Sequence, residues 1–171
     1  FHIQAGDYAA ALQAAQQAEQ VAVRPNNLRA WTCANVAELL LLRNEGLDHT
    51  ELERAEQHLR WAHNHFQSIG AEDGVLIVTH HLGELARKRC DWVQATQHFE
   101  RSLAMAEAAQ DLRMVARCQI GLGHVALAQG HSQQAAGYFA AAQARLDNLP
   151  AFLPLPALAE YRQAAARLGV G

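Results

Sequence analysis

The sequence is poor in the features that mark β-sheets, membrane spans and disulfide scaffolds. Aromatic residues make up only 6% of the 171 residues, and runs of Val, Ile and Thr are scarce, so strand signals are few. The longest apolar cluster, AELLLLR at residues 37–43, is far too short to span a bilayer, and no signal peptide is visible. The three cysteines are too few and too widely spaced for a disulfide framework or a zinc pattern. They favour a reducing, cytoplasmic compartment.

The charged residues exclude several further functions. Lys88 is the single lysine, the formal net charge is −3, and no basic stripe recurs, so we expect no nucleic-acid binding by this segment. His63 and His65 are two residues apart and His80 and His81 are adjacent, and neither spacing brings two ligands to one ion on a helix. No phosphate-binding glycine loop or nucleophile elbow is present. We therefore expect no metal, no cofactor, no membrane partner and no enzymatic activity.

The chain repeats one pattern at an interval of forty residues. LGELARKRCDWVQATQHFERS begins at Leu82, and LGHVALAQGHSQQAAGYFAAA begins at Leu122 (122 − 82 = 40). A helix break divides each copy, so each unit is predicted to be two helices. The first helix carries a Leu-Gly pair, and the second carries an alanine, a phenylalanine and a small residue at helical spacing, namely Ala95, Phe99 and Ser102 or Ala135, Phe139 and Ala142. Glycine lets a second helix approach closely, and we expect Phe99 and Phe139 to be buried.

The same frame recurs twice more toward the N-terminus. Ala37 takes the place of the glycine, and Ala55, Leu59 and Ala62 follow after six extra residues in the turn-like stretch NEGLDHTELE. At the front, Ala11, Ala15 and Ala18 occupy second-helix positions, and their first helix would precede Phe1. We therefore expect a fragment of a longer protein. An apolar strip of this first helix is predicted to support self-association or packing on a neighbouring domain; it consists of Tyr8, Ala11, Leu12 and Ala15.

Alanine abundance and local signals predict an all-α fold, an α-solenoid of antiparallel helix pairs closed by a capping helix. Capping boxes are predicted at Thr50 with Glu53 and at Asp91 with Gln94. The predicted helices span residues 7–23, 27–43, 50–68, 72–89, 91–108, 111–129, 131–147 and 156–168. One domain over residues 1–171 would hold repeats at about 1–25 (truncated), 26–70, 71–109 and 110–148, with a capping helix at 154–169.

This pattern resembles the tetratricopeptide repeat family. The resemblance rests on Leu82-Gly83 and Leu122-Gly123 in the first helices and on the Ala–Phe–small triplets in the second helices. The aromatic residue expected near the glycine is replaced by Ala86 and Ala126, and the period is 40 rather than the usual ~34. Longer repeats of this kind look like those of bacterial signal-transducing ATPases and of LuxR-type or maltose-regulator-type activators. The near absence of lysine is typical of a GC-rich bacterial genome.

The resemblance implies a protein–protein interaction scaffold in a bacterial multidomain regulator of signal transduction or transcription. In such arrays the first helix of each pair lines a concave groove. The positions that would face it are Trp31, Glu38, His80, Glu84, Arg87, Lys88, Arg117 and His124. Because arginine captures carboxylates in a bidentate manner, the predicted partner is an acidic peptide, a chain terminus or a partner domain. Arg87 and Arg117 are expected to be exposed, so replacing both by glutamate should leave stability unchanged.

Two alternatives to this interpretation remain open. The groove could instead bind a small effector and control an attached ATPase or DNA-binding domain. The same residues could also be an ordinary solvated helix face without a ligand.

Overall fold

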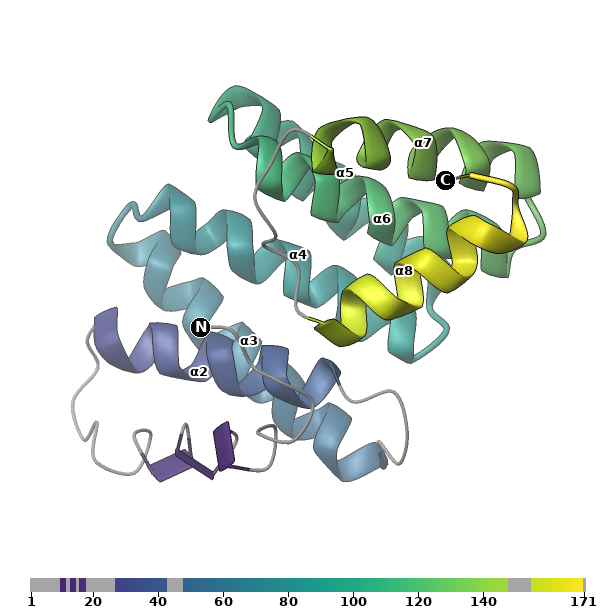
Figure 1. Cartoon of the computed structure of the whole chain (residues 1–171). Helices are drawn as coiled ribbons and strands as arrows, with labels where there is room; N and C mark the ends of the chain where they lie inside the picture. The colour runs from purple at the N-terminus through teal and green to yellow at the C-terminus, as the bar shows by residue number, and fades with distance from the viewer. Residues whose placement is uncertain are drawn as a thin grey trace.

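The computed structural model describes residues 10, 11, 13, 14, 16, 17, 27–42, 48–147 and 155–170, and these form helices and turns without a strand (Figure 1). The helices are α2 (Asn27–Leu41), α3 (His49–Ser68), α4 (Glu72–Lys88), α5 (Trp92–Ala108), α6 (Leu112–Ala128), α7 (Ser132–Leu146) and α8 (Leu155–Arg167). The all-α prediction is confirmed, and the predicted bounds of these seven helices are right to within two residues at each end. No helix of the described part of the chain is long and apolar enough to cross a membrane.

The predicted first helix, 7–23, lies mostly outside the described residues. Its apolar strip is represented there only by the half-buried Ala11, because Tyr8, Leu12 and Ala15 fall outside. The self-association predicted from this strip therefore stays a prediction.

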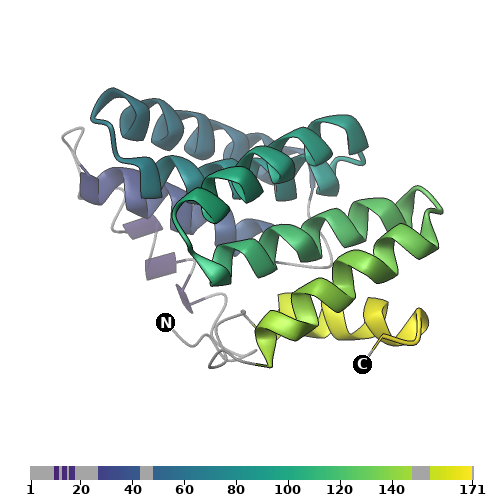
Figure 2. The same cartoon turned by 90° about the horizontal axis from the view of Figure 1, so that it is seen from above.

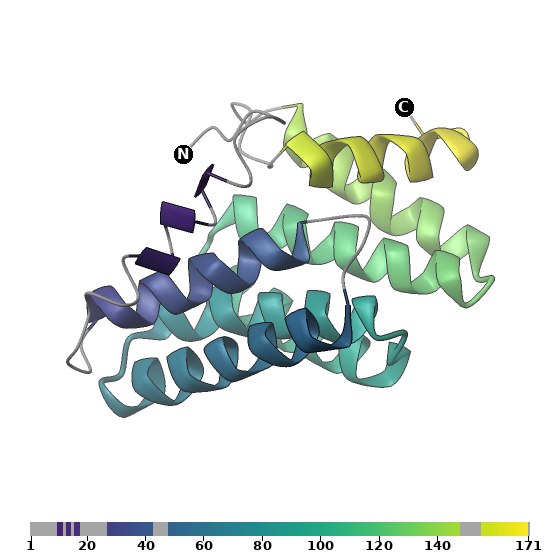
Figure 3. The same ribbon diagram turned by 90° about the horizontal axis from the view of Figure 1, so that it is seen from below.

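The helices pair in antiparallel fashion as α2 with α3, α4 with α5 and α6 with α7. The pairs stack in chain order, and α8 lies beside α7 at the C-terminal end of the stack (Figures 2 and 3). The first helices, α2, α4 and α6, also contact one another across the pairs, whereas α3, α5 and α7 do not. The first helices therefore form the inner layer of a curved array.

The repeated residues are the ones that dock neighbouring helices. Phe99 and Phe139 are fully buried, as predicted, and so are Ala95 and Ala135. The Phe99 ring lies between two glycines of successive first helices: a Cβ atom added to Gly83 or Gly121 would come within 2.8 or 2.6 Å of the ring. Because glycine has no side chain, α4 and α6 can both approach the Phe99 ring closely. Any side chain at Gly83 or Gly121 would force the helices apart.

The turns between helices recur every twenty residues, which is half of the forty-residue two-helix unit. A residue with left-handed backbone conformation follows every helix from α3 to α6, at Gly70, Cys90, Gln110 and Gly130, with φ values of 67°, 59°, 55° and 80°. The next N–H reaches back to the helix in each case, as in the bond from Asp111 to the carbonyl of Ala106 at 2.9 Å. Four identical helix stops therefore fix the angle between successive helices.

We expect Gln110→Gly to stabilise the protein by up to about 1 kcal/mol. A left-handed conformation costs roughly 1–2 kcal/mol for a residue with a Cβ atom, and the greater freedom of unfolded glycine offsets part of the gain. Urea unfolding of the variant measures the difference. Gln129→Gly, just before the turn that Gly130 already provides, is the control and should destabilise. A loss of stability in Gln110→Gly would contradict this account of the turns.

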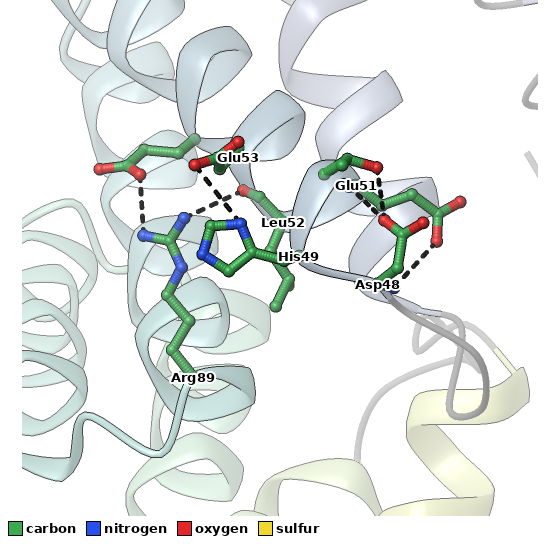
Figure 4. A network of polar contacts seen from close by, with 8 residues as sticks. Asp48, His49, Glu51, Leu52, Glu53 and Arg89 are labelled. Atoms are coloured by element: carbon green, nitrogen blue, oxygen red, sulfur yellow. Dashed lines mark hydrogen bonds and ion pairs between the residues drawn. The ribbon is translucent and has the colours of Figure 1, made fainter.

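Aspartate caps the starts of α3, α5 and α6, and one of the predicted caps is wrong. Helix α3 is capped by Asp48, whose carboxylate accepts the Glu51 N–H at 2.8 Å while the Glu51 side chain accepts the Asp48 N–H at 3.4 Å (Figure 4). The capping box is therefore Asp48 with Glu51 and not Thr50 with Glu53. Thr50 already lies inside the helix, and its hydroxyl donates to the Asp48 carboxylate at 2.6 Å. Of the capping box predicted at Asp91 with Gln94, the Asp91 half is confirmed, because its carboxylate accepts the Gln94 N–H at 3.1 Å.

Candidate functional site on the inner face

A polar pocket lies where the inner helices α2, α4 and α6 face α8. Its volume is about 50 Å³, and it is lined by Glu38, Leu41, Leu42, His80, His81, Glu84, Arg87, Arg117, Ile120, His124, Ala157 and Glu160. Six of the eight residues predicted for the groove are among them: Glu38, His80, Glu84, Arg87, Arg117 and His124. The repeat frame alone thus brings together residues from three different helices.

The other two predicted residues do not line the pocket. Trp31 packs against Phe66, with ring centroids 4.9 Å apart, and so belongs to the core between α2 and α3. Lys88 is half-buried at the end of α4 and does not reach the pocket lining. The predicted aromatic end of the groove is therefore not found at this pocket.

The most important residue that the sequence analysis missed is Glu160 of α8. It lies forty residues after Ile120, another lining residue (160 − 120 = 40). The period that identified the other positions extends into α8 and could have found it. The same arithmetic places Tyr161 forty residues after Gly121 (161 − 121 = 40). Tyr161 is buried against Phe139 with ring centroids 5.6 Å apart, so α8 takes the place of a further first helix.

One ion pair joins α2 to α6 across the inner face. The Arg117 guanidinium lies 2.7 Å from the Glu38 carboxylate. Burial alone would raise the pKa of Glu38, but the Arg117 guanidinium and the nearby His81 outweigh it and lower the pKa to about 2. Glu38 is therefore ionised at neutral pH, and the pair connects two helices that have α4 between them.

A second ion pair joins α4 to α8. Arg87 donates to both carboxylate oxygens of Glu160, at 2.7 and 3.2 Å, and to Glu84 at 2.9 Å. Burial opposes the charge on Arg87, but the two carboxylates raise the pKa of its guanidinium above its usual value. Arg87 in turn lowers the pKa of Glu84 and Glu160 against the effect of their burial. Bidentate pairing of an arginine with both oxygens of a carboxylate is a strong contact with a defined geometry.

These pairs correct the expectation that both arginines are exposed. The Arg87 side chain is only 13% exposed and the Arg117 side chain 19%. A helical periodicity shows which residues share a face, but it cannot show that α8 and the curvature of the array cover that face. The expectation that charge reversal at both positions leaves stability unchanged rested on that exposure, and we now expect a loss of stability instead.

The histidines of the pocket are neutral. Burial lowers the pKa of His81 to about 4, even though Glu38 favours its charged form. The pKa of His80 lies well below 6.5, through burial and then the Arg117 charge, and that of His124 is lowered through burial and then the Arg87 charge. The three rings add polar atoms without charge, so the pocket holds two guanidinium groups against three carboxylates.

Chemical catalysis finds little support in this arrangement. The Cys118 thiol lies 3.9 Å from His80 Nδ1 and donates to the Ser102 hydroxyl at 3.3 Å. Burial raises the pKa of Cys118 to about 11, so the thiol stays protonated at neutral pH and is a poor nucleophile. Within the described residues, no three His, Cys, Asp or Glu side chains come together in a way that could hold a metal ion.

We expect the free energy of unfolding to fall as the pH is lowered from 6.5 toward 4. Below pH 6.5 the unfolded chain protonates its histidines, while folded His81 resists protonation down to about 4, so acid favours the unfolded state. The shift of His81 alone corresponds to about 3 kcal/mol, and the lowered pKa values of His80 and His124 act in the same direction. Below 4.5, protonation of Glu38, which the folded state resists down to about 2, adds a further loss.

Urea titrations followed by circular dichroism at several pH values measure this dependence. An unfolding free energy that stays constant from neutral pH to about pH 5 would contradict the burial of neutral histidines.

Comparison with known proteins agrees with the helical repeat. Residues 74–148 match the sequence profile of a family described as tetratricopeptide repeat. The match begins in α4 and runs past the end of α7, so it contains both copies of the Leu-Gly and Ala–Phe pattern. A comparison with curated proteins finds no match. The family match supports tetratricopeptide repeats over residues 74–148, and repeats of this family are typically non-catalytic and generally mediate protein–protein interaction.

Proposed function

We propose that the chain is a protein-interaction module that binds a carboxylate-bearing partner on its inner face. The partner is an acidic peptide, a chain terminus or a partner domain that presents such a group. The observation that carries the proposal is the bidentate contact between Arg87 and Glu160, at 2.7 and 3.2 Å. In this contact Arg87 already holds a carboxylate from outside its own helix pair, and this supports the proposal.

A partner's carboxylate can reach Arg87 only where Glu160 of α8 now lies. Glu84 is three residues from Arg87 on the same helix, so it holds the guanidinium in place whatever else binds. Glu160 comes from 73 residues away, and its side chain is 29% exposed at the edge of the pocket. A carboxylate from a partner would therefore replace Glu160 rather than Glu84.

The wider setting is also part of the proposal. The forty-residue period of the chain and its scarcity of lysine favour a cytoplasmic, bacterial multidomain regulator of signal transduction or transcription. The effector-sensing alternative finds less support, because about 50 Å³ is well below the roughly 300–1,000 Å³ of usual small-molecule sites. Thermal-shift screening of metabolites tests that alternative: strong stabilisation by one compound would favour it.

The test of the main proposal is a gain of binding. The probe is a fluorescent peptide with acidic residues before a free C-terminal carboxylate, and the control peptide is amidated with Asn and Gln in their place. Glu160→Gln weakens the internal competitor for Arg87, so the acidic peptide should bind this variant roughly tenfold more tightly than the parent. Glu100→Gln, an exposed change on α5, is the matched control and should leave affinity unchanged.

Measurement by fluorescence anisotropy separates the outcomes. Equal affinities for Glu160→Gln, Glu100→Gln and the parent, or equal binding of the amidated peptide, would show that Arg87 does not receive the partner's carboxylate.

A further inference from the structure

A second and larger groove lies away from the inner face, at the edge where α4 begins and α3 and α5 end. Its volume is about 560 Å³, against about 50 Å³ for the inner pocket. Apolar side chains form much of its lining, namely Val75, Leu76, Met105, Ala108 and Ala109, and Gln67, Gly70, Glu72 and Asp73 complete it. The groove therefore has room for side chains of another molecule and an apolar surface to receive them.

Exposed apolar residues are concentrated at the same edge. Among the described residues, four large hydrophobic side chains are exposed: Leu28, Ile69, Val93 and Leu112. Ile69 directly precedes Gly70 of the groove, and Leu112 follows three residues after Ala109. Leu28 lies in the first turn of α2, whose neighbouring Asn27 contacts His65 near the end of α3 at 3.1 Å. Three of the four thus lie at one edge, where they extend the apolar surface.

Carboxylates without a partner are also concentrated at this edge. Most acidic side chains of the described residues hold an arginine or a histidine, cap a helix or accept another hydrogen bond. Glu72, Asp73, Glu100 and Glu107 have no such contact with a described residue. Glu72 and Asp73 line the groove, and Glu107 precedes its residue Ala108.

Helix stability accounts for only part of this charge. Acidic residues in the first turn of α4 suit the helix dipole, which explains Glu72 and Asp73. Glu107 lies in the last turn of α5, where the dipole disfavours a negative charge. Its position is unfavourable for the helix and favourable for a positively charged partner.

We propose that this edge groove docks a basic amphipathic segment of a partner protein. Apolar side chains of the segment enter the groove beside Ile69 and Leu112, and flanking Lys or Arg side chains pair with Glu72, Asp73 and Glu107. Charge complementarity decides the occupant, because an acidic segment would meet three unpaired carboxylates. The inference does not depend on what the inner face binds.

The experiment uses the full chain and a fluorescent amphipathic peptide of leucine and lysine. The control peptide has glutamate in place of every lysine. We expect the lysine peptide to bind, to weaken with added salt, and to shift the amide resonances of Gly70, Ala108 and Ala109. Glu72→Gln with Asp73→Gln should reduce its affinity roughly tenfold.

Matched pairs of variants place the site. Glu107→Gln should weaken binding, whereas Glu100→Gln on the same helix should not. Ile69→Ser should weaken binding, whereas Val93→Ser, a change of another exposed apolar side chain at the opposite end of α5, should not. All of these side chains are exposed, so the variants should keep the fold.

Three results would overturn the proposal. These are that the lysine peptide does not bind, that the glutamate peptide binds equally well, and that both members of each matched pair of variants lose the same affinity. The last result would mean that the peptide responds to overall charge and not to this groove.

Discussion

Replacing Phe99 by alanine is expected to lower the free energy of unfolding by about 3–5 kcal/mol. The ring is fully buried and fills the space between Gly83 of α4 and Gly121 of α6. Neither glycine has a side chain that could move into the cavity. The loss therefore combines the transfer free energy of the ring with the full cost of the void.

Chemical denaturation followed by circular dichroism measures this loss. Val93→Ala, on the exposed side of the same helix, is the control and should change stability by no more than about 0.5 kcal/mol. A loss below about 1 kcal/mol for Phe99→Ala would mean that Phe99 does not hold the two repeats together.

Reversing the charge of Arg117 is the second change expected to have a large effect. Arg117→Glu removes the partner of Glu38 at 2.7 Å and places a second carboxylate beside it in a largely buried site. Removal of one member of a buried pair typically costs about 3–5 kcal/mol, and the remaining exposure of both side chains should bring the loss toward the lower value.

Two further variants show whether the loss comes from this pair. Arg101→Glu makes the same change of charge on the exposed side of α5 and should cost less than about 1 kcal/mol. Glu38→Arg combined with Arg117→Glu restores opposite charges and should recover part of the stability. An Arg117→Glu protein as stable as Arg101→Glu would show that the link between α2 and α6 contributes nothing.

The helices and their docking residues were accessible from the sequence because both depend on local periodicity. The forty-residue interval between Gly83 and Gly123 fixed the frame, and spacings of four and three residues placed Phe99 and Phe139 in the core. The left-handed turns at Cys90 and Gln110 could not be predicted in this way, since neither residue type favours that conformation. The cap of α3 was misplaced because Asp48 and Thr50 are both acceptable capping residues, and the helix start decides between them.

The sequence predicted six residues of the candidate site but not their burial or their pairing. The frame selected Glu38, Arg87 and Arg117, because residues at equivalent repeat positions face the same side of the array. The prediction that Arg87 and Arg117 are exposed was wrong. Side chains from distant helices, Glu160 of α8 and Glu38 of α2, pair with them and cover that side of the array. The sequence by itself determined the seven described helices, their order and six of the residues that line the inner pocket, since these follow from side-chain spacing along each helix. Only the tertiary structure decided that the charges of the inner face pair with one another and that the roomier groove lies at the edge. Both depend on how closely helices far apart in the chain approach.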